Sequence, residues 1–216
     1  MSKSKLSYVL MLAIVAIFIL YIAFVQWIQD PEAAVFLGSK TNLNHPLNKN
    51  LWLTVMRVHV VFACIGMVSG AVNFSDRFRR TNRKFHRLNG YWYLVTVMLV
   101  GLTSGYMAPY ATGGRGVSIA FNVLTMLWPA FTVIAILQIR KKRIQSHQKW
   151  MIRSYAYCFT NLTVHLLTSF FQASAGWSYA DSYRVSVYMT IPLLYFIAEI
   201  VIRMVMKKPQ RTFGPT

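Results

Sequence analysis

The stretch RVHVVFACIGMVSGAVNFSDRFRRTNRKFHRLNGYWYL, from Arg57 to Leu94, indicates the architecture of the chain. It begins in an apolar run of helical length, continues through a connection that contains six lysine and arginine residues, and enters a second apolar run. Inside a bilayer every backbone polar group must be paired within the protein, and a continuous apolar run achieves this as an α-helix. The pattern therefore predicts two membrane-spanning helices joined by a short basic loop.

The same pattern recurs along the whole chain. Of its 216 residues 56% are hydrophobic and 13% are charged, and the mean hydropathy is +0.42, whereas soluble domains have about 25% charged residues. A window of about 19 residues finds runs that are long enough to span a membrane. They are Leu6–Ile28, Leu51–Phe74, Leu88–Ala108, Val117–Ile139, Gln148–Phe171 and Arg184–Met206. We expect an all-α integral membrane protein with six transmembrane helices and a central four-helix bundle.

The basic residues are distributed unevenly among the connections. The N-terminus, the second and fourth connections and the C-terminal tail hold 16 of the 23 lysines and arginines. Positive loops remain in the cytoplasm, so we expect both termini on the cytoplasmic side of the membrane, with the basic loops against anionic lipid. The net charge of +18 is also typical of nucleic-acid-binding proteins, but the clustering of the charges between apolar runs argues against that function.

The chain divides into three parts. Residues 1–50 form an N-terminal membrane anchor and an external loop, residues 51–172 form the four-helix core, and residues 173–216 form an external loop, the sixth helix and a basic cytoplasmic tail. The first apolar run is longer than that of a signal peptide and no small-x-small cleavage site follows it closely, so we expect it to be retained.

Four histidines are expected at two depths in the membrane. His59 and His165 lie roughly 12 Å and 9 Å below the outer surface, and His86 and His147 stand at cytoplasmic helix ends, roughly 27 Å away along the helix axis. His147 and His165 are eighteen residues apart. On an uninterrupted helix with about 100° per residue this places both on one side.

Two histidines on facing helices are a typical arrangement for ligating haem iron within a helical bundle. We therefore predict haem b with His59 and His165 as axial ligands, and a possible second pair formed by His86 and His147, for electron transfer across the membrane. The distance between the two levels is long for direct electron exchange, which disfavours the second pair. Small residues next to His59, such as Ala63, permit either close helix packing or insertion of a flat ligand.

Other interpretations of the polar residues remain open. Histidines at cytoplasmic helix ends, such as His86 and His147, also bind lipid phosphate or cap a helix. A polar side chain within a membrane helix, such as His59 or His165, often only hydrogen-bonds to a neighbouring helix. Arg153, Asn161 and Glu199 are further polar residues within the spans, and the spacing of Glu199 and Arg203 favours an ion pair along one helix. The alternatives to haem are a small transporter or channel-like protein with Arg153, Asn161 and Glu199 along a polar path, or an accessory protein without cofactor.

Two segments carry a resemblance to a known family. The first is the quoted stretch, with His59, two glycines, and a His-Arg-x-x-Gly-x-x-Tyr motif from His86 to Tyr93. The second is HQKWMIRSYAYCF, from His147 to Phe159. They resemble the bacterial membrane proteins grouped as domain of unknown function 2306, over about residues 51–170. The resemblance implies the topology but no activity, because the family has none established.

The placement of the histidines is also similar to that of cytochromes b of the 561 type, which implies haem ligation. The redox partner or quinone and a possible homo-oligomer are left open.

Overall fold

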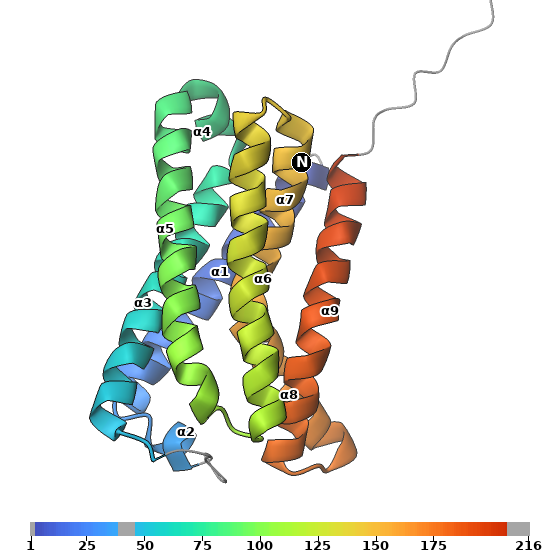
Figure 1. The fold of residues 1–216 in the computed structure, drawn as a ribbon. Coiled ribbons are helices and arrows are strands. Elements are labelled where there is room, and N and C mark those ends of the chain that lie inside the picture. The colour runs from blue at the N-terminus through green and yellow to red at the C-terminus, as the bar shows by residue number, and fades with distance from the viewer. Residues whose placement is uncertain (1–2, 39–45, 207–216) are drawn as a thin grey trace, which may run out of the picture.

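The computed structural model describes residues 3–38 and 46–206. Within this part of the chain the structure consists of helices and their connections, without a β-strand (Figure 1). The expected all-α architecture is confirmed.

Five helical segments are long and apolar enough to cross a membrane among the described residues. They coincide with five of the six apolar runs of the sequence. They are α1 (Lys3–Phe24) with its π-helical extension η1 (Val25–Gln29), α3 (Lys49–Asn73), α5 (Arg83–Met107), α6 (Arg115–Arg140) and α9 (Tyr179–Val205).

The remaining run, Gln148–Phe171, is not one helix. It is divided into α7 (Ile144–Ala156), a 3₁₀ turn η3 (Tyr157–Phe159) and α8 (Thr160–Ala175). In Figure 1, α7 lies toward one end of the bundle and α8 toward the other. Six uninterrupted spans are therefore not what the structure has, and the expectation that His147 and His165 share one side of a continuous helix loses its basis.

Two hydroxyl groups hold the turn between α7 and α8. Thr160 Oγ1 donates a hydrogen bond of 2.7 Å to the carbonyl of Tyr157, and the Tyr157 hydroxyl donates one of 3.1 Å to the carbonyl of Ile191 on α9. Side-chain hydroxyls that bond to nearby carbonyls compete with the regular helical pattern. The interruption is thus fixed both locally and by α9.

Short helices occupy the connections. They are α2 (Ala34–Gly38), α4 (Asp76–Thr81) and the 3₁₀ turn η2 (Ala108–Tyr110). The side chain of Asn82 accepts a hydrogen bond from the backbone N–H of Phe85 and so caps the start of α5, which is a preferred role of asparagine. This cap separates α4 from α5 within the basic connection.

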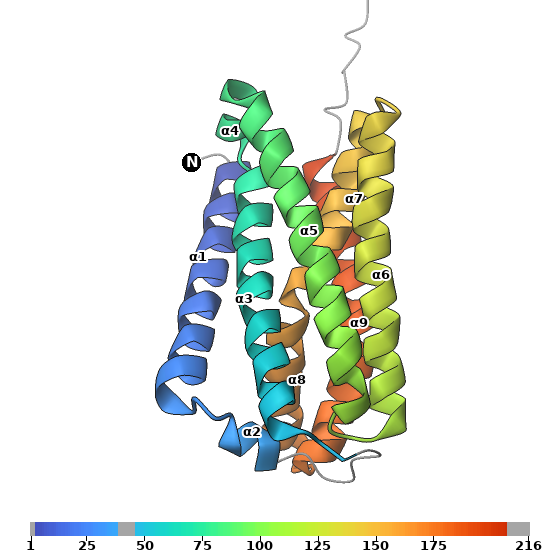
Figure 2. The same ribbon diagram turned by 60° about the vertical axis from the view of Figure 1, so that its left-hand side comes forward.

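The helices pack in a sequence of neighbours. α3 lies along α5, α5 along α6 and α6 along α7, while α9 packs on both α7 and α8. Figure 2 shows α1 on one side of the bundle next to α3. Tyr93 and Val97 of α5 are fully buried at the centre of the largest apolar cluster. α9 therefore packs into the bundle together with α3, α5, α6 and the α7–α8 segment, so the bundle extends beyond the four helices of residues 51–172.

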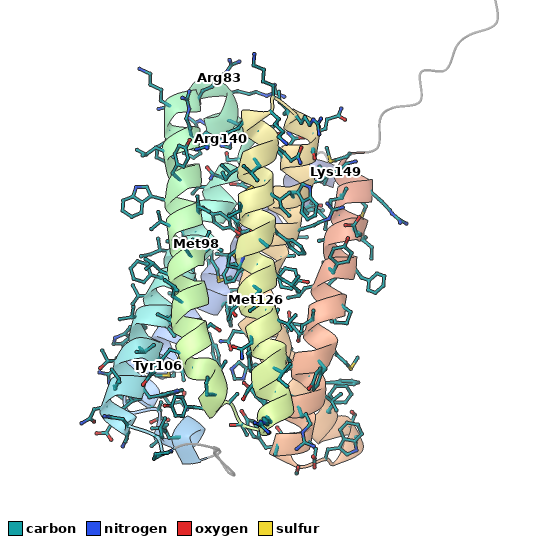
Figure 3. All side chains as sticks on the ribbon, viewed as in Figure 1. Arg83, Met98, Tyr106, Met126, Arg140 and Lys149 are labelled. Carbon is teal, nitrogen blue, oxygen red and sulfur yellow. The ribbon has the colours of Figure 1, made fainter. Side chains whose placement is uncertain are left out.

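The outer surface has the character of a lipid-facing surface. Leu102 and Met126 are each 73% exposed although both are large apolar residues. Figure 3 shows Met126 near mid-height, while Arg83, Arg140 and Lys149 gather at one end of the bundle, which we call the basic end. A continuous apolar belt with charges confined to the ends is the pattern of a membrane-integral bundle.

Candidate functional site

A cavity of about 350 Å³ lies among the helices, and its lining runs from Asp30 and Ala111 in two connections to Trp128 and Cys158 within the bundle. Its walls come from α1, α3, α5, α6, α8 and α9 and are mostly apolar. Its volume is within the range of small-molecule sites, roughly 300–1,000 Å³. Such a cavity, with a few polar side chains on apolar walls, is the usual form of a binding site between helices.

His59 and His165 both line this cavity. His59 reaches it from α3, and its Nδ1 lies 3.0 Å from Oγ1 of Thr103 on α5. His165 reaches it from α8, and its ring has no hydrogen-bond partner within the described part of the chain. The two histidines that the sequence places at one depth therefore line the same cavity, His59 as a half-buried and His165 as an exposed residue.

Two amides accompany the histidines. Asn161 precedes His165 by four residues on α8 and lines the same cavity. Gln26 enters from η1, and its Nε2 is buried without a hydrogen-bond partner among the residues described. Because an unpaired buried amide is costly, Gln26 is a candidate contact for a bound molecule.

Cys64 and Cys158 also line the cavity. From the sequence we expect only a packing role for them, because two thiols make neither a disulfide framework nor a zinc site. Cys158 is buried next to the Tyr93 hydroxyl, with an O–S distance of 3.7 Å. These contacts are consistent with packing at the deep end of the cavity.

The other two histidines lie apart from the cavity. Neither His86 nor His147 contributes to its walls. His147 Nδ1 lies 2.9 Å from the carbonyl oxygen of Ala135 on α6, so its N–H joins α7 to α6. This interhelical hydrogen bond gives His147 a structural contact that is neither lipid phosphate binding nor helix capping.

Arg153 forms an ion pair with Glu199 across two helices. The distance from Arg153 Nε to Glu199 Oε1 is 2.6 Å, and the guanidinium lies 4.6 Å from the ring centroid of Trp150. The expected pairing of Glu199 with Arg203 is therefore wrong, because the packing of α7 on α9 brings Arg153 within reach. Neither member of the pair lines the cavity, so Arg153, Asn161 and Glu199 do not line one common path.

A closed chain of hydrogen bonds joins α5, α6 and α7 next to the cavity. The Thr132 hydroxyl donates to the Trp128 carbonyl at 3.0 Å, so it accepts from Ser154 Oγ at 2.7 Å. Ser154 then accepts from the Tyr93 hydroxyl at 2.8 Å, and Tyr93 accepts from the Trp128 indole N–H at 3.4 Å. Every hydroxyl in this buried ring is satisfied, which favours a structural role.

The glycines of α3 explain how closely the helices approach. A Cβ added at Gly70 would lie 2.4 Å from ring carbons of Tyr155, and one at Gly66 would lie 3.1 Å from Thr96 Oγ1. The Tyr155 hydroxyl donates a hydrogen bond of 2.9 Å to the Met67 carbonyl. At these positions the small residues serve close packing, whereas Ala63 lines the cavity.

Gln26, which lines the cavity, and Thr103, which contacts His59, are two residues of the site that the sequence alone does not single out. A threonine in an apolar helix resembles many others that only bond to their own backbone. The π-helical turn that brings Gln26 to the cavity has no sequence signal in the run VQWIQ. Both roles depend on how the helices are rotated and packed.

These features define a multi-pass α-helical membrane protein with a cavity lined by a pair of histidines. The family model described as "Predicted membrane protein (DUF2306)" matches residues 56–202, and the chain belongs to this family. The match extends beyond the segments that carry the resemblance and includes most of α9. No curated protein and no solved structure matches the chain, so the similarity to cytochromes b of the 561 type stays a prediction.

Proposed function

We propose that the protein is a membrane electron carrier that binds haem b in the cavity, with His59 and His165 as the axial ligands. One observation supports this above the others: the two histidines come from α3 and α8, more than a hundred residues apart in the chain, and line one cavity. Cofactor sites in helical bundles are built from inward side chains on facing helices in this way.

The chemistry of the cavity fits a haem. Its apolar walls, which include Met56, Val100 and Val164, suit a flat macrocycle. His165 has both ring nitrogens available, because it has no hydrogen-bond partner within the described residues. A bound haem would supply a one-electron centre whose potential depends on the axial ligands and on burial.

The basic end also suggests how the protein is oriented in the bilayer. We infer that α7 and α8 together form a sixth passage through the bilayer, and that the basic end faces the cytoplasm of a bacterial cell, next to anionic lipid. Both termini would then be cytoplasmic and the haem would lie in the outer half of the membrane. The second pair, His86 and His147, has no support from the cavity and is not part of the proposal.

The geometry supports the two alternatives, a transporter or channel-like protein and an accessory protein without cofactor, less well. A transporter or channel-like function would use Arg153 and Glu199 along a polar path, but these residues are paired with each other away from the cavity. An accessory role without cofactor would leave the unpaired polar side chains of the cavity, such as Gln26 Nε2, unexplained.

Visible absorption spectra of the detergent-purified protein test the proposal, recorded after air oxidation and after reduction with dithionite. The wild type should give a Soret band and sharp reduced α and β bands, which His59→Ala and His165→Ala should each remove. His147→Ala is the matched control, because His147 is a histidine outside the cavity, and it should keep the bands. A colourless wild type from cells with ample haem would overturn the proposal.

A further inference from the structure

The hydrogen bonds of Thr103 determine the tautomer of His59. Thr103 Oγ1 lies 2.8 Å from the carbonyl oxygen of Leu99 and 3.0 Å from that of Val100. A carbonyl oxygen can only accept, and a hydroxyl has a single hydrogen. The Thr103 hydrogen is therefore directed at these carbonyls.

His59 must consequently be the donor in its contact with Thr103. Its Nδ1 lies 3.0 Å from Thr103 Oγ1, whose own hydrogen is already used. The remaining lone pairs of Oγ1 can accept, so the hydrogen of this contact sits on Nδ1. Neutral imidazole carries one N–H, and Nε2 is then left with a free lone pair.

We propose that Thr103 is a positioning residue that holds His59 as the Nδ1–H tautomer, so that the cavity binds a metal centre or a hydrogen-bond donor through His59 Nε2. This inference deepens the proposed function and rests on the same cavity. Histidines that ligate metals commonly donate the other ring N–H to a neighbouring acceptor, which fixes the tautomer and the ring orientation.

The tautomer also restricts the class of ligand. The carbonyl oxygens of an oxidised quinone need hydrogen-bond donors, and His59 Nε2 in this tautomer offers none. A haem iron, or a molecule with a hydroxyl group, satisfies the lone pair. His59 therefore selects for a Lewis acid or a donor at this wall of the cavity.

Solid-state ¹⁵N NMR of histidine-labelled protein in lipid bilayers tests the tautomer without haem. The chain is expressed under haem limitation, and the His59 signals are assigned from their loss in His59→Asn. We expect a protonated Nδ1 and a bare Nε2 in the wild type. A hydrogen on Nε2 of the wild-type ring would overturn the inference, whatever any variant does.

Three variants test the role of Thr103 itself. Thr103→Val removes the hydroxyl acceptor but leaves the Val100 carbonyl as a hydrogen-bond partner of the His59 ring, so it should lower the share of the wild-type tautomer, while Thr103→Ser should restore the wild-type spectrum. Thr125→Val is the matched control, because Thr125 also lines the cavity but, among the described residues, its hydroxyl bonds only to the Asn122 carbonyl of its own helix. An unchanged tautomer in Thr103→Val would contradict the positioning role.

A haem titration separates this inference from the proposed function. If the wild type binds haem, Thr103→Val should weaken the affinity by about 10–100-fold and shift the midpoint potential, and Thr103→Ser should leave both close to wild type. An equal affinity and potential in Thr103→Val would overturn the positioning role. A wild type that binds no haem would end the haem proposal, while the NMR result would still decide the tautomer.

Discussion

Arg153 of α7 and Glu199 of α9 form an ion pair with an Nε–Oε1 distance of 2.6 Å, although Arg203 lies one turn from Glu199 on the same helix. The side chains of the pair are 15% and 25% exposed, so they are largely withdrawn from the surface. α7 is only 13 residues long and is followed by the 3₁₀ turn. The ion pair is therefore a main polar link between the interrupted segment and α9.

Breaking this pair should destabilise the bundle. We expect Arg153→Met or Glu199→Leu to lower the free energy of unfolding by about 1–3 kcal/mol, because each leaves one charge without its partner at low exposure. The double variant should recover part of the loss, since no unpaired charge remains. Unfolding of the purified protein in mixed detergent, analysed as a double-mutant cycle, measures the coupling.

Arg203→Met serves as the control for the ion pair. Arg203 is exposed and forms no ion pair within 4 Å in the described part of the chain. Its loss should change stability by less than about 0.5 kcal/mol. A larger effect of Arg203→Met than of Arg153→Met would show that Arg203 is the energetically important partner after all.

The ring of hydrogen bonds through Tyr93 should also contribute to the stability of the bundle. Tyr93→Phe removes the hydroxyl that accepts from Trp128 and donates to Ser154. Because Tyr93 is fully buried, this should cost about 1–3 kcal/mol of stability. Thermal unfolding of the variant measures it, with Tyr91→Phe as control, since Tyr91 is 43% exposed on the same helix.

The effects on stability of two substitutions within this hydrogen-bonded ring should also be non-additive. Combining Tyr93→Phe with Thr132→Val should cost less than the two single variants together, because the first already opens the ring. Strict additivity of the two changes would contradict the closed arrangement of hydroxyls.

The packing of Tyr155 on Gly70 makes a third prediction. The Cβ of Gly70→Ala would meet ring carbons at 2.4 Å, and overpacking of this kind costs about 1–3 kcal/mol. Gly105→Ala is the matched control, because a Cβ there has no neighbour within 4 Å, and it should raise stability by about 0.5–1 kcal/mol through helix propensity. Thermal unfolding compares the two, and a stable Gly70→Ala would show that α3 and Tyr155 are not in close contact.

The spans of the bundle can be predicted from the sequence because their apolar runs are long and end at charged clusters. The interruption at Tyr157–Phe159 cannot, since Tyr, Cys and Phe continue the apolar composition and none of them is a helix breaker. The hydroxyl bond from Tyr157 to α9 that holds this turn is a tertiary contact. For this reason the sequence predicts that Gln148–Phe171 crosses the membrane, but it does not predict that this run is divided into α7, η3 and α8.

The candidate site is also only partly predictable. The depths of His59 and His165 follow from counting residues along helices, and both line one cavity. The partner of Glu199 and the contact of Thr103 with His59 depend on the rotation of each helix about its axis. Uniformly apolar helices leave this rotation undefined, because every face can be placed against lipid or protein.

Haem ligation by His59 and His165 can be tested from the amount of haem bound per chain. Haem is quantified as its pyridine complex, against protein concentration, in the purified wild type and in single alanine variants of His59, His165, His86 and His147. We predict about one haem per chain in the wild type and in the His86 and His147 variants, and almost none in the His59 and His165 variants. No haem in the wild type, or its loss only with His86 and His147, would contradict the account.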